Sequence, residues 1–342
     1  MSVRPGPRNL ISDVAGLTVG HAQDDRVKSG VTVLLPETGW VAAADIRGGG
    51  PGTRETDALG PGRLVARADA LVFSGGSAFG LAAADGVMNW LAARGRGYDT
   101  GAAVVPIVPA AILYDLANEG DKHWGMEPPY RALALSACEG AGADFALGRV
   151  GAGRGARAGG LPGGIGSASA VDGGAADGGT VDGETGDGTG VTVGALAAVN
   201  SFGSVTMADG TFLAWPFEMG DEFGGRRPTG APESPEPHFP KLARPRGNTT
   251  LVAVATDAAL DHSQAIRLAA MAQDGLARAI RPAHTPFDGD SVFTLASGAA
   301  GRVDALGLAR IGAIAADCVA RAIARAVYES AEGLLNSAPT GT

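Results

Sequence analysis

Short apolar runs of strand length alternate along this chain with alanine-rich stretches of helical spacing, and this alternation constrains the fold more than any other feature. The runs "VTVLLPE", "WVAAADI" and "TTLVAVATD" are rich in valine and alanine and end at polar or turn-forming residues, as buried strands do. Glycine, at 55 of 342 residues, separates many of these segments. Because 45% of the residues are apolar, the chain can bury a sizeable core, as one large domain or as two ordinary ones. We expect a layered α/β fold around one core.

Three alanine-rich stretches are predicted to be helices. The first follows a buried strand expected at 70–74 and a tight glycine turn. The second begins after Asp261 or Ser263, either of which can cap its first turn. The third spans 303–335, carries a broad apolar stripe, and contains glycines at which it could break.

The turn "GGSAFG" after the first of these strands places Ser77 where a strand meets a helix. The letters do not satisfy the Gly-x-Ser-x-Gly pattern of a nucleophile elbow, and they also miss the dinucleotide-binding fingerprint. We therefore predict that Ser77 belongs to a tight turn and caps the helix that follows.

The charge balance and the cysteines exclude several classes of function. With 36 acidic and 27 basic residues, the net charge of −9 repels phosphate backbones and anionic membranes. Cys138 and Cys318 lie far apart in apolar stretches, so we predict buried thiols rather than a disulfide or a metal site. The N-terminal segment lacks the apolar centre of a signal peptide. The sequence predicts a cytoplasmic protein with neither nucleic acid nor membrane as a partner.

Two segments have no apolar period. Residues 172–190 are dominated by Gly, Asp and Thr and are predicted to form a loop, because they are too polar to repay the entropy of ordering them in a core. Oxygen ligands for calcium are plentiful there, but their spacing matches neither an EF-hand nor a nonapeptide repeat. Residues 220–247 are rich in proline and are predicted to be an exposed linker.

The proline-rich linker ends where a strand begins, at "GNTTLV". A flexible linker followed by Asn248, Thr249 and a rigid strand is what a self-cleaving hydrolase needs, because the Thr249 hydroxyl can attack the preceding carbonyl and water can resolve the ester. Cleavage would free the Thr249 α-amino group, whose unperturbed pKa of about 7.7–8 suits a general base near neutral pH. An ordinary boundary between a loop and a strand gives the same letters, so the residues alone leave both interpretations open.

Four stretches carry a resemblance to a known family: "DIRGGGPGTRETD", "SGGSAFGLAAADGV", "VTVGALAAVNSFGSV", and the region from "GNTTLVAVATD" to "DGDSVFTLASG". Together they resemble the P1 family of self-processing peptidases (peptidase family S58). This family includes the DmpA-type aminopeptidases, the β-peptidyl aminopeptidases and the nylon-oligomer hydrolases such as NylC. The similarity runs from about Asn9 to Tyr328.

The resemblance implies a fold and a maturation step. The fold would be an αββα sandwich of the N-terminal-nucleophile hydrolase type, built as one catalytic domain over 1–342. Cleavage between Asn248 and Thr249 would give a large chain, 1–248, and a small chain, 249–342, that stay together and assemble into a homotetramer. The family implies no cofactor, and no histidine here has a metal-binding spacing such as His-Glu-x-x-His.

The resemblance also assigns residues to the site. Thr249 matches the nucleophile, and Asn200 matches the Asn that holds the reacting groups or the oxyanion. Asp288 and Asp290 match the acidic pair of the nylon-hydrolase branch and would orient the Thr249 hydroxyl and ammonium. Tyr114 matches a Tyr that would donate to the substrate carbonyl. Without the family, these residues would be interpreted as an Asn bonding its own turn, a solvated Asp-Gly-Asp turn and a core tyrosine.

One position departs from the family. The nylon-hydrolase branch has a lysine in the stretch that matches "GAGRGARAGGLPGG", and the resemblance matches that lysine to Gly160 here. Either Arg154 or Arg157 supplies the positive charge, or the site works without it, and Arg cannot serve as a base. A Ser-His-Asp scheme that combines His284 with Asp288 is a further alternative.

The sequence therefore predicts a self-activated amide hydrolase with an N-terminal threonine nucleophile. Its expected substrates are small peptides, amino-acid amides or 6-aminohexanoate oligomers. The alternatives are an aminopeptidase or esterase of the DmpA type without activity on nylon oligomers, and a catalytically inert binding protein of the same fold.

Overall fold

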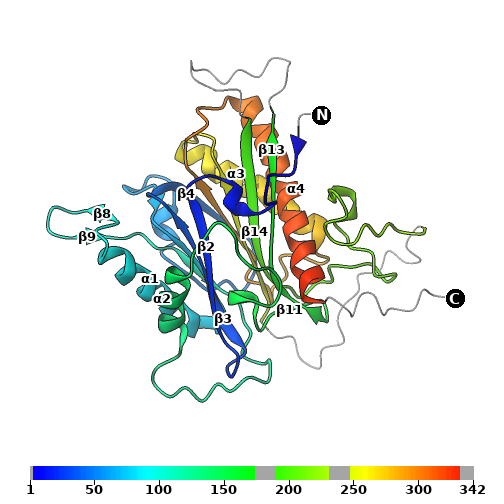
Figure 1. The fold of residues 1–342 in the computed structure, drawn as a ribbon, viewed down its shortest axis with the longest axis horizontal. Coiled ribbons are helices and arrows are strands. Elements are labelled where there is room, and N and C mark those ends of the chain that lie inside the picture. The colour runs from blue at the N-terminus through cyan, green and yellow to red at the C-terminus, as the bar shows by residue number, and fades with distance from the viewer. Residues whose placement is uncertain (1–2, 174–189, 231–246, 332–342) are drawn as a thin grey trace.

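A pair of sheets packed face to face forms the centre of the computed structural model, which describes residues 3–173, 190–230 and 247–331 (Figure 1). Within these residues the larger sheet has the strand order β1 (Val3–Arg4), β13 (Gly164–Asp172), β14 (Val191–Asn200), β15 (Thr249–Thr256), β16 (Ser291–Ala296), β4 (Trp40–Ile46), β6 (Arg67–Ala68). The smaller sheet has the order β2 (Leu17–Asp24), β3 (Ser29–Pro36), β7 (Leu71–Ser74), β10 (Ala110–Ile112), β5 (Thr53–Arg54). Two short pairs stand apart, β8 (Tyr98–Asp99) with β9 (Val104–Val105) and β11 (Arg157–Ala158) with β12 (Leu161–Pro162).

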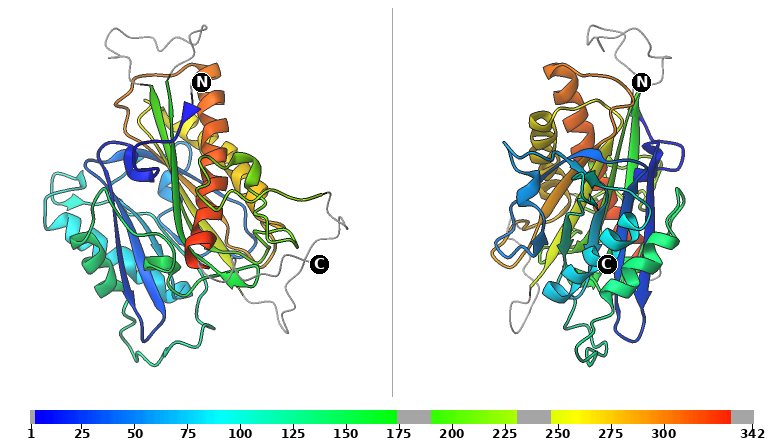
Figure 2. Two further views of the ribbon diagram at one scale, coloured as in Figure 1. Left: turned by 45° about the vertical axis from the view of Figure 1, so that its right-hand side comes forward. Right: turned by 90° about the vertical axis from the view of Figure 1, so that its left-hand side faces the viewer.

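Helices cover the outer faces of both sheets. On the smaller sheet pack α1 (Ala83–Ala92) and α2 (Tyr130–Glu139), and on the larger sheet pack α3 (His262–Ala279) and α4 (Ala305–Ser330). The layers are therefore helix, sheet, sheet, helix, which is the predicted αββα sandwich (Figure 2). Short 3-10 helices occur at Ile11–Asp13, Asp57–Leu59, Ser77–Ala82, Gly151–Gly153 and Trp215–Phe217.

The central strands are apolar on both faces because each sheet is covered on both sides. Along β15, Leu251 and Ala253 pack between the sheets, whereas Val252 and Val254 pack under α3 and α4. Because side chains alternate along a strand, Thr249 shares the face of Leu251. The predicted nucleophile, Thr249, is thus the first residue of β15, and its side chain lies on the face that packs against the smaller sheet.

The helices on the larger sheet begin and pack as their residues dictate. The side chain of Asp261 accepts the Gln264 N–H (2.8 Å), and the side chain of Gln264 accepts the Asp261 N–H (3.0 Å). This is the predicted cap of α3, and such a box stabilises a helix by about 1 kcal/mol. The third predicted helix has no break, because α4 runs unbroken through Gly307 and Gly312. Gly312 permits close packing instead, since a Cβ atom there would lie 2.2 Å from Cε of Met271 in α3.

The turn between β7 and α1 is tight, as predicted, with left-handed backbone at Gly76 (φ 85°) and Ser77 (φ 52°). The predicted cap is wrong, because Gly76 occupies the cap position and no side chain bonds to this helix end. Both cysteines are buried and free, as predicted, and burial raises the pKa of each thiol to about 12.

Two predicted segments fall largely outside the described residues. The loop expected at 172–190 is described only at its ends, and of the linker expected at 220–247 only 220–230 and Gly247 are described. In the described part of the chain, no helix has the length and apolar character required to cross a membrane.

Candidate active site

Thr249 opens β15 and is 3% exposed. Its hydroxyl donates a hydrogen bond to the carbonyl of Asn248, the residue before it. The same carbonyl accepts the backbone N–H of Gly289 at 2.9 Å. The carbonyl of the Asn248–Thr249 bond, where the sequence predicts self-cleavage, therefore accepts two hydrogen bonds, one from the Thr249 hydroxyl and one from the Gly289 N–H.

Gly289 lies directly against the Thr249 hydroxyl. A Cβ atom at Gly289 would stand 2.7 Å from Thr249 Oγ1 and 3.0 Å from the carbonyl oxygen of Gly50. The Asn248 N–H donates to the carbonyl of Phe287 at 2.9 Å, so the chain before Thr249 runs parallel to this segment. A glycine between the two acidic residues is needed here because the backbone and the Thr249 hydroxyl meet.

Asn200 ends β14 and pairs with Thr249 in antiparallel register. It shares the face of Ala198, which packs between the sheets. Its amide Nδ2 donates to the carbonyl of Tyr114 on the opposite sheet (2.9 Å), and its Oδ1 accepts the Arg157 N–H (2.9 Å). Asn200 therefore links the segments of Tyr114 and Arg157 to the start of β15. Its side chain does not bond within its own turn in these contacts.

Tyr114 follows β10 in the smaller sheet and is half-buried. A Cβ atom at Gly247 would lie 3.2 Å from both Cβ and Cγ of Tyr114. The tyrosine thus sits beside the chain that leads into the Asn248–Thr249 bond.

Asp290 is 1% exposed and binds the residue after the predicted nucleophile. Its Oδ1 accepts the Thr250 N–H at 2.8 Å. Its Oδ2 accepts the backbone N–H of His284 at 2.9 Å and lies 3.0 Å from the ring Nδ1 of the same residue. The triad alternative that combined His284 with Asp288 is therefore wrong in its pairing.

Asp288 is equally buried but has other partners. Its Oδ1 accepts the Phe202 N–H at 3.2 Å, and its Oδ2 accepts the N–H (3.0 Å) and hydroxyl (2.6 Å) of Thr285. Desolvation and the negative charge of Asp290 raise the pKa of Asp288, although these donors oppose the shift. Two buried carboxylates so close together resist ionising at the same time.

The glycine run after β4 supports the acidic segment. The backbone N–H groups of Arg47 and Gly48 donate to the carbonyl of Asp290 (3.0 and 3.1 Å), and that of Gly50 donates to the carbonyl of Asp288 (2.8 Å). A Cβ atom at Gly48 would lie 2.3 Å from the backbone nitrogen of Asp290. Only glycine allows this approach of two backbones.

Gly160, the position that the resemblance matches to the family lysine, has left-handed backbone (φ 97°), and among the described residues a Cβ atom there would have no neighbour within 4 Å. The guanidinium of Arg157 donates to the Gly160 carbonyl at 3.0 Å, while its backbone N–H holds Asn200. Arg154 is paired with Asp25 at 2.7 Å. Of the two arginines proposed to supply the positive charge, Arg157 contacts Asn200, and it does so through its backbone N–H rather than its guanidinium.

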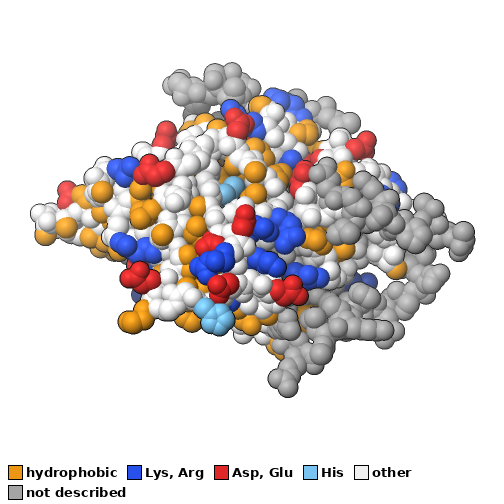
Figure 3. Space-filling model, turned by 60° about the horizontal axis from the view of Figure 1, so that its bottom comes forward, with side chains coloured by type: hydrophobic (Ala, Val, Ile, Leu, Met, Phe, Trp, Pro, Cys, Tyr) orange, Lys and Arg blue, Asp and Glu red, His pale blue; other side chains and the backbone are white. Residues whose placement is uncertain are grey.

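Basic side chains gather at the end of the molecule that carries β11 (Figure 3). Burial and the neighbouring charges of Arg154 and Arg157 lower the pKa of Arg149, so these three arginines share one neighbourhood. Among the residues that the structure describes, no three His, Cys, Asp or Glu side chains form a cluster that could hold a metal ion.

The contacts of His284, Thr285 and Phe202 were not predicted from the sequence. All three bind the acidic pair, yet no pattern of letters marks them as partners of Asp290 or Asp288. The sequence gives one hint of these contacts, because His284 and Thr285 lie a few residues before "DGD"; Phe202 has no such proximity.

Known proteins resemble this chain over most of its length. The model of peptidase family S58 matches residues 9–335 of the chain. The chain belongs to peptidase family S58. Within the family it is 45% identical to an uncharacterized aminopeptidase of Mycobacterium tuberculosis, over 97% of this chain and 95% of that protein. It is 27% identical to the 6-aminohexanoate-oligomer endohydrolase of Kocuria sp., over 85% of this chain and 75% of that protein.

Solved structures give the same assignment. A beta-aminopeptidase of Burkholderia sp. matches with a TM-score of 0.68 and 25% identity, over 94% of this chain and 87% of that chain. The L-aminopeptidase D-Ala-esterase/amidase of Ochrobactrum anthropi, described as a variant of the Ntn hydrolase fold, matches with a TM-score of 0.69 and 22% identity, over 96% and 88%. The αββα sandwich of the N-terminal-nucleophile type is thus confirmed. This S58 chain is a hydrolase that acts on amide bonds.

Proposed function

We propose that the chain cuts itself between Asn248 and Thr249 and then hydrolyses small amides with Thr249 as its N-terminal nucleophile. The observation that carries the proposal is the contact of the Thr249 hydroxyl with the Asn248 carbonyl, which the Gly289 N–H also holds. A side-chain hydroxyl and the carbonyl before it react through a five-membered ring, so no diffusion is needed to bring them together.

The self-cleavage step balances with these groups. Oγ1 of Thr249 loses its proton and attacks the carbonyl carbon of Asn248, and negative charge collects on the carbonyl oxygen. The Gly289 N–H, 2.9 Å from that oxygen, is placed to stabilise the charge. The C–N bond then breaks, its nitrogen takes up a proton, and the Asn248 acyl group remains as an ester on Thr249. Water hydrolyses the ester and frees the hydroxyl beside the new α-amino group.

Turnover would reuse the same residue on a substrate. The free amine takes the hydroxyl proton, the hydroxyl attacks the substrate amide, and the departing amine leaves protonated. Asp290 holds the peptide after Thr249, and with Asp288 it would orient the Thr249 hydroxyl and ammonium between cycles. Asn200 fixes the position of Tyr114, which lies where it can meet a substrate carbonyl after the Asn248 end departs.

The substrates that this site favours are small peptides and amino-acid amides, as for an aminopeptidase. Linear oligomers of 6-aminohexanoate are a second candidate because the Asp-Gly-Asp pair resembles the nylon-hydrolase branch, and Arg157 would supply the positive charge in place of the family lysine. We further propose that chains 1–248 and 249–342 remain one unit, and that these units associate as a homotetramer.

Mass spectrometry of the purified protein tests the proposal. Wild-type protein should give two chains that end and begin at Asn248 and Thr249. Thr249→Ala should remain a single chain near 34.0 kDa and be inactive. As a matched control, Thr100→Ala removes an exposed threonine from the turn between β8 and β9 and should be cleaved normally. Cleavage of Thr249→Ala at the same bond contradicts the proposal, and an uncut, inactive wild type favours the inert binding protein.

A further inference from the structure

We propose that His284 is a positioning residue for the Thr249 nucleophile and acts through Asp290, an inference that rests on the proposed function. His284 contacts Asp290 twice, because its backbone N–H and its ring Nδ1 meet the same carboxylate oxygen, at 2.9 and 3.0 Å. The other oxygen accepts the Thr250 N–H at 2.8 Å. The carboxylate therefore bridges the histidine and the peptide group that joins Thr249 to Thr250.

Burial makes the bridge rigid. The Asp290 side chain is 2% exposed and the His284 side chain 22%. A carboxylate removed from water needs donors for its oxygens, and three donors surround this one. Because an ionised carboxylate only accepts hydrogen bonds, Nδ1 of His284 carries the hydrogen. The ring thereby fixes the plane of the carboxylate and the direction in which Oδ1 faces the Thr250 N–H.

The backbone of His284 is adapted to the double contact. Its φ of 56° lies in the left-handed region, which residues with a side chain rarely adopt. In this conformation the N–H and the ring reach one oxygen atom. Strained residues of this kind persist where the surrounding structure holds them, and they gather at functional sites.

The neighbouring carboxylate does not share the histidine. Asp288 takes its donors from Thr285 and Phe202. The two buried carboxylates thus have separate sets of partners. The described contacts of the His284 ring and N–H are with Asp290 rather than with the reacting groups, so the residue acts by positioning.

Two variants separate the side-chain donor from the backbone conformation. His284→Asn keeps a donor near the place of Nδ1, and asparagine tolerates left-handed backbone. His284→Gly accepts the same backbone but has no side-chain donor. We expect His284→Asn to cleave itself and turn over within about 3-fold of the wild type. His284→Gly should cleave itself about 10-fold or more slowly, and its kcat should fall about 10-fold while KM changes less than about 2-fold, as expected when positioning rather than substrate binding is lost.

Thermal melting of both variants establishes that they are folded. Wild-type rates in His284→Gly overturn the inference, and so does an equal loss in folded His284→Asn. If the glycine variant does not fold, His284→Gln takes its place, because its amide reaches the position of Nε2 rather than Nδ1 and should lose the same activity. Thr249→Ala, assayed in parallel, separates failure of this inference from failure of the proposed function. Cleavage of Thr249→Ala at the Asn248–Thr249 bond rejects the proposed function. If Thr249→Ala stays uncut while His284→Gly cleaves itself and turns over at wild-type rates, only the role of His284 is rejected.

Discussion

Gly289 lies so close to Thr249 that a Cβ atom on the glycine would stand 2.7 Å from the threonine hydroxyl oxygen. Gly289→Ala should therefore push the hydroxyl away from the Asn248 carbonyl and shift the N–H that holds this carbonyl. We expect self-cleavage to slow by about 100-fold, the usual cost of losing one donor to a developing oxyanion. Gel electrophoresis of freshly expressed protein over time measures the rate.

Gly230→Ala is the matched control for this change, because in the described part of the chain a Cβ atom at Gly230 would meet no neighbour within 4 Å. It should be processed at the wild-type rate. Rapid processing of Gly289→Ala would remove the Gly289 contact from the mechanism.

The charge near Gly160 gives a second prediction. Arg157→Ala should lower kcat/KM for amide substrates by about 10-fold, because it removes the exposed guanidinium that we propose supplies the positive charge of the site. It leaves the backbone N–H that binds Asn200 in place. Salt should weaken the contribution of this exposed charge. Arg154→Ala breaks only the pair with Asp25 and should change kcat/KM less than about 2-fold. Steady-state kinetics at low and high salt compare the two, and equal effects of both substitutions argue against a specific role for Arg157.

The sequence predicted the parts of this molecule that depend on local pattern or on family motifs. The continuous apolar run of β15 after a polar linker placed Thr249 at the start of a strand, and the letters around Asp261 predicted the cap of α3. What could not be predicted are contacts between distant segments. Gly48 meets Asp290 because β4 pairs with β16, and no local pattern reveals that order of strands.

The partners of the site residues show the same limit. The Asp-Gly-Asp pair was visible in the sequence, but the donors of its two carboxylates were not. Asp290 is bound by His284 and Asp288 by Thr285. The contact between His284 and Asp290 depends on the left-handed backbone of His284, which no local pattern reveals. Ser77 is not a cap because it is the first residue of the 3-10 helix Ser77–Ala82, whose cap position is the left-handed Gly76.

Partly buried His21 should make the protein sensitive to mild acid. Burial lowers the pKa of His21 to about 4 from its ordinary value of 6.5, partly opposed by the backbone of Ala146. Between these two pH values the unfolded chain binds a proton that the folded chain does not, so the free energy of unfolding falls as the pH falls from 6.5 to 4. The loss amounts to about 3 kcal/mol, at 1.36 kcal/mol for each pH unit.

Urea unfolding at pH 7 and at pH 4.5 measures this loss. His21→Asn retains a partner for the Thr32 hydroxyl, which lies 2.9 Å from the ring Nδ1, but has no group that titrates in this range. Its free energy of unfolding should fall less than that of the wild type over the same interval. Equal losses in the two proteins would exclude His21 as the cause.

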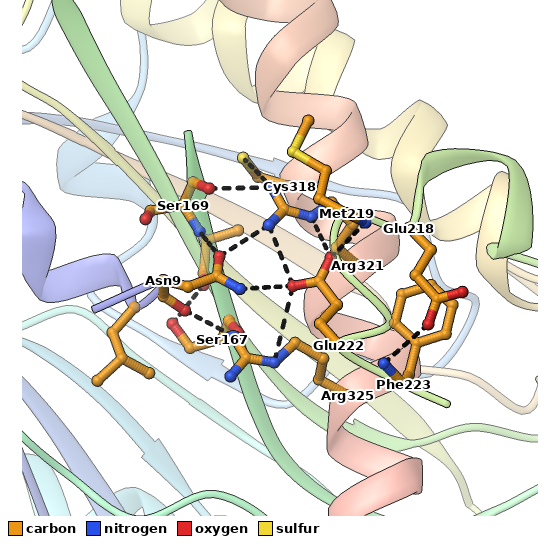
Figure 4. Close-up of polar contacts among 12 residues, drawn as sticks. Asn9, Ser167, Ser169, Glu218, Met219, Glu222, Phe223, Cys318, Arg321 and Arg325 are labelled. Atoms are coloured by element: carbon orange, nitrogen blue, oxygen red, sulfur yellow. Dashed lines mark hydrogen bonds and ion pairs between the residues drawn. The ribbon is translucent and has the colours of Figure 1, made fainter. Parts of the chain in front are cut away.

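Arg321 of α4 is fully buried and joins segments that would belong to different chains after self-cleavage (Figure 4). Its guanidinium donates to both carboxylate oxygens of Glu222 (2.5 and 3.0 Å), to the side chain of Asn9 (2.7 Å) and to the carbonyl of Ser169 (2.9 Å). Glu222→Ala leaves this cation buried without its partner. We expect a loss of about 3–5 kcal/mol in the free energy of unfolding.

A more exposed ion pair between α3 and α4 provides the control. Asp317 and Arg278 lie 2.6 Å apart but are more than a third exposed, so Asp317→Asn should cost less than about 1 kcal/mol. In processed Glu222→Ala, chain 249–342 should also separate from chain 1–248 at a lower urea concentration than in the wild type, because the cluster ties α4 to Asn9 and Ser169. Size-exclusion chromatography across a urea series measures this separation. Unchanged midpoints for both unfolding and separation would mean that the buried pair does not hold the two chains together.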